Sequence, residues 1–145
     1  VEARLGRRPE WPDSIPPTRD VLIASGKPYI IENVVGAPLS KDCILCGSMF
    51  DLGVRRHRIF ETTVGILLRP DCNHTTQPIG IYGVKADGRR LWGKKGNHPN
   101  LRAANSVEEA QEAMGIDWME WRELCEAIPP AYTEFIGRQL LQAIA

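Results

Sequence analysis

Apolar residues in the first third of the chain form short runs that Pro and Gly residues separate. Pro16 and Pro17 suit the first turn of a helix, and the apolar residues after them continue toward Gly26, which favours a stop there. The β-branched and aromatic run 29–31 follows at once and predicts a buried strand that ends at 32–34. A helix, a tight turn and a buried strand are half of a β–α–β unit, so this pattern predicts an α/β fold with a parallel sheet.

The middle of the chain predicts further strands and one turn. Residues 43–46 are expected to open a Gly-containing turn. Short strands are expected at 58–62, 64–68 and 79–84, where β-branched residues recur between breakers.

The last forty residues have helical patterns. Ser106 is a suitable N-cap for a helix over 107–114, and Glu109 stands three residues later, as a capping box requires. Another helix is expected from Asp117 to Cys125. The final helix is expected from Pro129-Pro130 onward, with a stripe of apolar residues at helical spacing that predicts core packing: Tyr132, Phe135, Ile136, Leu140 and Ile144.

The composition is that of an ordinary globular protein. Of the 145 residues, 43% are hydrophobic and 25% are charged, which suits one compact domain and excludes a wholly disordered chain. No apolar run approaches the roughly 20 residues that cross a bilayer, and the first residues lack the layout of a secretory signal. We therefore expect a cytoplasmic protein without a membrane partner, whose four cysteines are thiols or metal ligands rather than a disulfide framework.

Charge is balanced in total but segregated along the chain. Eighteen basic residues match eighteen acidic ones, yet residues 85–102 hold six basic side chains, Lys94 and Lys95 among them, and a single acid. This Gly-rich basic stretch, together with Arg55, could contact the phosphate backbone of double-stranded DNA. A solvated loop is the simpler alternative.

Glu32 and two arginines are the residues best suited to acid–base chemistry. Glu32 follows a predicted buried strand, where open α/β sheets place functional groups, and poor solvation would raise its pKa enough to hold a proton near neutral pH. Asn33 beside it can fix the carboxylate or bond a backbone group. Arg56 and Arg58 alternate, so both should point to one side of an extended segment and suit a phosphate or a carboxylate. A salt-bridging Glu and a solvent-facing Arg pair are the alternatives.

Soft metal ligands occur in two places. Cys43 and Cys46 are separated by two residues, and Cys72 and His74 by one. Four such ligands would satisfy a tetrahedral zinc ion, whereas buried, unligated thiols are the alternative.

Three ordered motifs resemble those of cytosine-5 DNA methyltransferases. The run Pro28–Val34 is similar to the family's Glu-Asn-Val motif, and Val54–Phe60 resembles its Gln-x-Arg-x-Arg motif. Residues Glu126–Pro130, continuing to Ile136-Gly137-Arg138, resemble its closing Asn-x-Val-Pro-Pro motif. Two further segments, 45–50 and 91–99, are similar to the small phage and prophage branch.

This resemblance implies a fold and a domain layout. The fold would be the carboxyl-terminal part of a Rossmann-like methyltransferase sheet, with a small target-recognition segment and C-terminal helices. Residues 1–69 would form a partial catalytic α/β segment, 70–105 a reduced recognition segment, and 106–145 helices that return to the catalytic domain.

The resemblance also implies residue roles. Family members flip the target cytosine, add a cysteine thiolate to carbon 6 and methylate carbon 5 with S-adenosyl-L-methionine. Glu32 matches the carboxyl group that bonds ring nitrogen 3, Arg58 an arginine that holds the flipped nucleotide, and Arg56 one that supports the glutamate. Asn33 would also contact the substrate, and Ile128 and Pro129 would lie beside the cofactor.

Departures from the family pattern indicate a partial enzyme. The Gly-rich cofactor strand and the Pro-Cys nucleophile motif are missing, Val54 replaces Gln, and Cys125-Glu126 stands where Gly-Asn is usual. We therefore expect no methyl transfer by this chain alone, and expect a complementary N-terminal half or self-association through an unpaired strand edge. The alternatives are a DNA-binding remnant of a methyltransferase and, third, a small zinc nuclease that uses His74 and His98.

Overall fold

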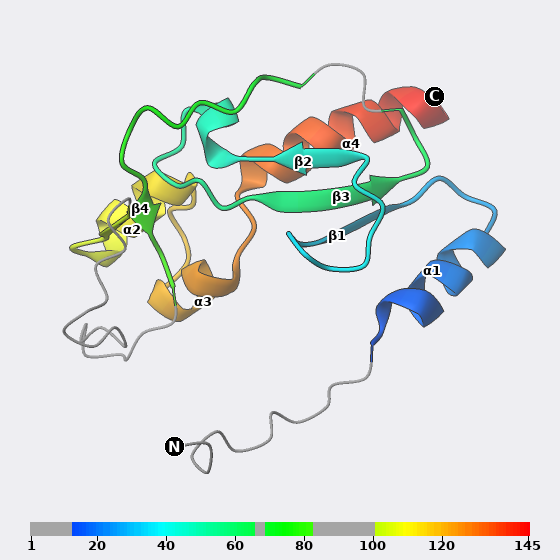
Figure 1. Cartoon of the computed structure of the whole chain (residues 1–145), viewed down its shortest axis with the longest axis horizontal. Helices are drawn as coiled ribbons and strands as arrows, with labels where there is room; N and C mark the ends of the chain where they lie inside the picture. The colour runs from blue at the N-terminus through cyan, green and yellow to red at the C-terminus, as the bar shows by residue number, and fades with distance from the viewer. Residues whose placement is uncertain (1–12, 66–68, 83–100) are drawn as a thin grey trace, which may run out of the picture.

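The computed structural model describes residues 13–65, 69–82 and 101–145, which form a mixed α/β arrangement (Figure 1). The elements in the first part are α1 (Ile15–Ala24), β1 (Ile30–Val34), β2 (Cys43–Leu45), the 3₁₀ turn η2 (Gly47–Phe50), β3 (Arg58–Thr62) and β4 (Ile79–Gly80). The last part holds β5 (Arg102–Ala103), α2 (Val107–Met114), α3 (Trp121–Glu126) and α4 (Pro130–Ile144).

The larger sheet has three strands in the order β1-β3-β2. β3 runs antiparallel to both neighbours, with Glu32 opposite Phe60 in one pair and Cys43 opposite Phe60 in the other. The parallel pairing that the sequence predicted beside β1 is therefore not present among the described strands of this sheet. The chain instead reverses after β2, through η2 and residues 51–57, and brings β3 back between the first two strands. The single parallel pair described is the short β4-β5 ladder.

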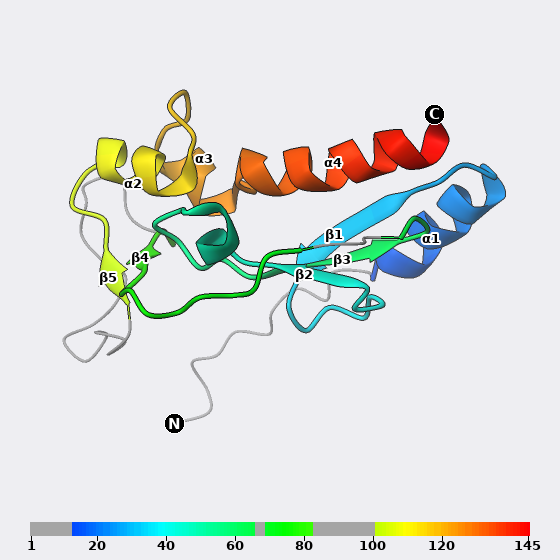
Figure 2. The ribbon, with the colours of Figure 1, turned by 90° about the horizontal axis from the view of Figure 1, so that it is seen from above.

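The helix α4 covers one face of the sheet (Figure 2). Phe60 and Leu45 point toward it and pack with Tyr132 and Ile136 in one buried cluster. The ring of Phe50 completes this layer, with its centroid 5.4 Å from that of Tyr132. The apolar stripe predicted for the last helix is thus confirmed as core at Tyr132 and Ile136, whereas Ile144 at the end of the helix is exposed.

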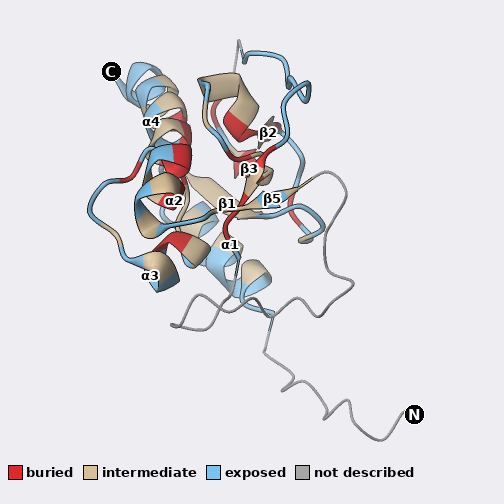
Figure 3. Cartoon of the chain, turned by 90° about the vertical axis from the view of Figure 1, so that its left-hand side faces the viewer, coloured by how far each residue is buried: buried red, intermediate tan, exposed pale blue. Residues whose placement is uncertain are grey.

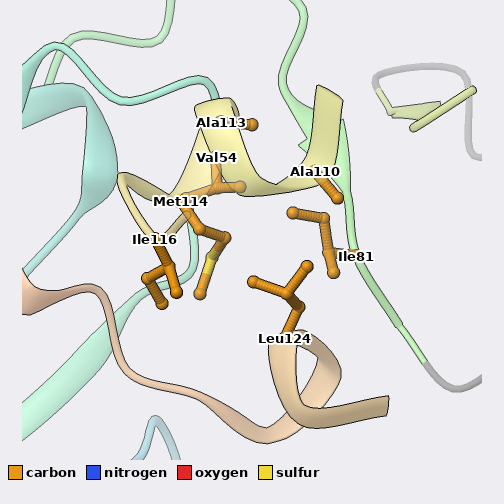
Figure 4. Close-up of a cluster of buried hydrophobic side chains, with 7 residues drawn as sticks. All are labelled: Val54, Ile81, Ala110, Ala113, Met114, Ile116 and Leu124. Atoms are coloured by element: carbon orange, nitrogen blue, oxygen red, sulfur yellow. The ribbon is translucent and has the colours of Figure 1, made fainter. Parts of the chain in front are cut away.

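A second hydrophobic cluster lies beside the sheet, around α2 and α3 (Figure 4). Val54 and Ile81 meet residues of the two helices there, and Leu52 touches both clusters. The members are Val54, Ile81, Ala110, Ala113, Met114, Ile116 and Leu124. Residues 52–54 therefore join the two cores, and they lead directly into the Arg-rich segment.

The helix α1 has no buried residue (Figure 3). Its strongest contact with the sheet is polar, because Arg19 donates from Nε and Nη2 to the two carboxylate oxygens of Glu61, each at 2.7 Å. Val21 and Ile23 of α1 and Val34 of β1 remain exposed. This end of the molecule thus presents apolar side chains that no described element covers.

Several predicted elements match the structure and others differ. The helices near Pro16, after Ser106 and after Pro129 are confirmed, as is the strand at 58–62. Residues 43–45 form a strand where a turn was predicted, because they pair with β3. The third helix begins at Trp121, since Glu120 rather than Asp117 provides its capping box with Glu123. Of the strand predicted at 79–84, Ile79 and Gly80 form β4, whereas residues 81 and 82 are not in a strand. Val64 and Gly65 are not in a strand either, and residues 66–68, 83 and 84 lie outside the described residues.

None of the helices in residues 13–65, 69–82 and 101–145 combines the length and the apolar character that crossing a bilayer demands.

Candidate functional site

Glu32 lies in the middle of β1, on the sheet face that α4 covers. The strand ends at Val34, within the predicted 32–34, but Glu32 is not at its carboxyl end and no residue of β1 is buried, so both of these expectations are wrong. Its partner across the ladder is Phe60, and directly opposed residues share a face. The Oε1 atom of Glu32 is shielded from solvent and accepts no hydrogen bond from the described residues. A buried acceptor without a donor is costly, so it is a natural place to look for a ligand.

Arg58 at the start of β3 is the charged partner of Glu32. Its Nε lies 3.0 Å from Oε1 of Glu32, close enough for an ion pair but without the alignment of a hydrogen bond. Burial raises the pKa of Glu32 above its ordinary value, and the charges of Arg58 and Arg56 offset only part of that rise. The result is a carboxyl group that retains its proton more readily than an exposed glutamate.

Arg56 is buried and joins this region to the C-terminal helices. Its Nη2 donates to the carbonyl of Cys125 at 2.5 Å, and its Nη1 donates to that of Ile81 at 3.3 Å. The backbone of Arg56 is left-handed, with φ of +35°, a conformation that non-glycine residues rarely adopt. Burial, followed by the charge of Arg58, lowers its pKa. Strain and burial at one residue show that the surrounding packing holds it firmly in this position.

Tyr132 secures the same segment from α4. Its hydroxyl donates to the carbonyl oxygens of Arg55 and Arg56, both at 3.1 Å, and the side chain is fully buried. Burial raises the pKa of Tyr132 far above its usual range, so it remains a donor at all ordinary pH values. The segments around Glu32, Arg56–Arg58 and Cys125–Tyr132 therefore meet at one place, although up to a hundred residues separate them in sequence.

Other predicted site residues lie near this place but face elsewhere. Asn33 points to the opposite sheet face from Glu32 and accepts from the backbone N–H of Val34 at 2.8 Å, which is one of the two roles expected of it. Arg55 donates to the carbonyls of His74 and Thr76, so its guanidinium organises a loop. Pro129 is fully buried and Ile128 packs against the α4 cluster. Lys94 and Lys95 lie outside the described residues.

The metal ligands expected from the sequence are brought together only in part. Cys46, Cys72 and His74 lie close to one another, and His57 joins them. Cys43 does not, because it points from β2 into the core with Phe60 and Tyr132, as the alternative of a buried, unligated thiol predicted. His98, expected beside His74 in a zinc nuclease, lies outside the described residues. His57 was missed, although it stands between two arginines already singled out and imidazole is a common ligand.

Comparisons with protein families, with curated protein sequences and with solved structures find no match to this chain.

Proposed function

We propose that this chain is the carboxyl-terminal part of a DNA cytosine-5 methyltransferase and that it holds the flipped cytosine through Glu32 and Arg58, which Arg56 helps to position. The observation that carries the proposal is the meeting of three distant segments. Glu32 pairs with Arg58, Arg56 binds the carbonyl of Cys125, and Tyr132 binds the carbonyls of Arg55 and Arg56. These are the three segments whose sequences resemble the family's motifs.

The state of Glu32 suits the role of a proton donor to a pyrimidine ring. Nucleophilic attack on carbon 6 pushes charge onto ring nitrogen 3, and a protonated carboxyl group bonded there stabilises the adduct. Glu32 has a raised pKa and an enclosed oxygen without a hydrogen bond. Positioned proton transfer of this kind typically contributes about 10²- to 10⁴-fold to the rate.

The two arginines have different parts in the proposal. Arg58 lies against Glu32 through Nε, and it would contact the flipped nucleotide beside that carboxylate. The two Nη groups of Arg56 already donate hydrogen bonds to the carbonyls of Ile81 and Cys125. Arg56 is therefore a positioning residue, which holds the segment that carries Arg58 against the last two helices.

Two features support the view that another polypeptide segment completes the site. β1 is an edge strand within the described part of the chain, and α1 beside it exposes Val21 and Ile23. S-adenosyl-L-methionine, the methyl donor of this reaction class, would be held mainly by that other segment, because Pro129 is buried and Ile128 is partly buried against the core. The cofactor pocket and the cysteine nucleophile would belong to the missing segment.

Complementation tests the proposal. The chain would be mixed with an amino-terminal methyltransferase half that carries a Pro-Cys motif and a Gly-rich cofactor strand, and transfer of labelled methyl groups to double-stranded DNA would be measured. We expect no transfer by either part alone and transfer by the mixture, reduced about 10²- to 10⁴-fold by Glu32→Gln. Glu134→Gln, in an exposed ion pair on α4, is the matched control and should leave transfer unchanged.

Two results would contradict the proposal. Transfer that survives Glu32→Gln would remove Glu32 from the chemistry. A mixture that binds DNA in a salt-dependent way but never transfers methyl groups would instead favour a DNA-binding remnant.

A further inference from the structure

Four soft ligands from three segments converge on the other side of the Arg-rich segment. Cys46 follows β2, His57 precedes β3, and Cys72 and His74 lie in the loop after residue 68. One ligand atom from each of these four residues lies within 4.8 Å of every other. This cluster is separate from the Glu32 site, because Arg55 and His57 contact the loop that holds Cys72 and His74, whereas Arg58 contacts Glu32.

The distances suit a single tetrahedral ion. Zinc bonds of about 2.3 Å to sulfur and 2.0–2.1 Å to nitrogen place neighbouring ligand atoms about 3.3–3.8 Å apart. The Sγ of Cys46 lies 3.4 Å from Nε2 of His74, and the Sγ of Cys72 lies 3.4 Å from Nε2 of His57. One pair, Cys72 and His74, is closer at 2.7 Å and would have to separate slightly. The two imidazole rings are nearly perpendicular, so each presents its Nε2 from a different direction.

The backbone around the cluster is fixed in a way typical of metal sites. Ser48 lies with its Oγ 3.2 Å from Sγ of Cys46, and it accepts a hydrogen bond from the N–H of Asn73. Gly47 approaches the neighbouring segment so closely that an added Cβ would lie 1.9 Å from the carbonyl oxygen of Val54. This contact brings Cys46 beside His57. Outer partners of this kind orient ligands in known metal sites.

The loop that carries two of the ligands has no apolar anchor. Every residue from Arg69 to Gln77 is exposed. Its described contacts are polar ones, including those from Arg55 to the carbonyls of His74 and Thr76. A segment that buries no apolar surface needs another source of order, and a metal ion supplies it in many small domains.

We propose that Cys46, His57, Cys72 and His74 bind one zinc ion in a structural site. Two thiolates and two imidazoles in tetrahedral arrangement favour zinc among the common divalent ions, and four protein ligands leave no position for a catalytic water. Each cysteine loses its thiol proton to solvent when the ion binds, and the imidazoles bind as neutral rings. The proposal is independent of the methyltransferase assignment, since it needs no substrate.

The site would also fix the segment that carries the candidate base-binding arginines. Arg58 donates from Nη1 to the carbonyl of His57 at 3.0 Å. A zinc ion on the imidazole of His57 would hold that carbonyl, and with it the guanidinium that faces Glu32. A metal site on one side of residues 55–58 would thus stabilise the geometry on the other side.

Metal analysis of the purified 145-residue chain, kept reduced, tests the proposal. We expect one zinc ion per chain after loading and dialysis. Cobalt in its place should give the ligand-field bands of a tetrahedral ion and a thiolate-to-metal charge-transfer band. Cys72→Ser and His74→Ala lie in the exposed loop, so they should preserve the fold. Each should weaken metal binding more than the loss of a residue that only hydrogen-bonds a ligand, which typically costs about 10- to 100-fold.

Cys43→Ser and Cys125→Ser are the matched controls, and both should keep one zinc ion with unchanged cobalt bands. A second readout is proteolysis: the serine protease Glu-C, in a buffer where it also cleaves after Asp, should cleave after Asp71 faster once a chelator removes the metal. Retention of zinc by both loop variants would overturn the proposal. So would a reduced chain that holds no zinc after loading and dialysis, or zinc lost from Cys43→Ser but not from Cys72→Ser.

Discussion

Two glutamates of the same sheet differ in how well their arginine partners satisfy their charge. Glu61 on β3 receives both arms of Arg19 at 2.7 Å and the N–H of Ser40 at 2.9 Å. Glu32 on β1 has one 3.0 Å contact with Arg58 and an enclosed oxygen that accepts no described hydrogen bond. The first pair is complete in itself, whereas the second leaves room for another donor or acceptor.

The difference appears directly in the two pKa values. The hydrogen bonds from Arg19 lower the pKa of Glu61, whereas burial raises the pKa of Glu32. A sheet can therefore hold one glutamate as a structural anion and another as a group ready to take up a proton. Such under-satisfied groups are typical of functional sites, where local stability is given up.

The largest effect on stability is expected from Arg56, which supports the Glu32 side. Arg56→Met leaves the carbonyls of Ile81 and Cys125 without their charged donor in a buried place. Hydrogen bonds to charged groups contribute about 1.5–3 kcal/mol, so we expect the free energy of unfolding to fall by about 3 kcal/mol. Urea denaturation at neutral pH measures it.

Arg138→Met, at an exposed position of α4, is the control for loss of an arginine and should change the urea midpoint little. An Arg56 variant as stable as this control would show that the buried guanidinium does not join the sheet to α3.

The two glutamates should respond to pH in opposite directions. The pKa of Glu32 is raised above 4.5 in the folded state, so its charge destabilises the fold as pH rises through that raised value. Glu32→Gln should match the parent near pH 4 and be more stable at neutral pH, by up to about 1 kcal/mol. The pKa of Glu61 is lowered, so Glu61→Gln should be less stable at neutral pH, by more than the ~0.5 kcal/mol of surface changes.

The deficit of Glu61→Gln should shrink as pH falls from 4.5 through the lowered pKa of Glu61, because the unfolded parent takes up a proton on Glu61 before the folded parent does. Denaturation midpoints of the parent and the two variants, measured between about pH 3.5 and 8, would separate these trends. This range extends to both sides of the ordinary pKa of a glutamate. Parallel curves for the two variants would remove the distinction between the pairs.

Sequence patterns predicted those elements whose boundaries are set by residues close together in the chain. Two prolines and a glycine bound α1, and Ser106 caps α2 as its spacing predicts, accepting from the N–H of Glu109. The strand β2 was missed because three residues carry no alternation, and what makes them a strand is pairing with β3. Long-range pairing of this kind overrides local preference.

In the candidate sites too, features set by nearby residues could be predicted, whereas those set by long-range packing could not. Glu32, Arg56 and Arg58 could be named from residue type and spacing, because charged side chains beside predicted strands are conspicuous. Cys43 was chosen as a ligand on its two-residue spacing from Cys46, but strand alternation turns it into the core. His57 reaches the cysteines only because the chain after β2 packs closely against residues 54–55, a contact that spacing does not reveal.

The smallest effect is expected from the shortest of these ion pairs. Arg138 lies 2.5 Å from Glu134 one helical turn away, but both side chains are largely exposed. Water screens such a pair and its ordering costs side-chain entropy, so Glu134→Gln should change the free energy of unfolding by only about 0.3–0.5 kcal/mol. Urea denaturation in low and high salt measures this, and the residual effect should vanish in high salt. If Glu134→Gln lowered the free energy of unfolding as much as Glu61→Gln does, the contribution of each ion pair would depend on its N···O distance alone. The contrast between Glu32 and Glu61 would then reflect 0.3 Å of distance rather than the hydrogen bonds that one has and the other lacks.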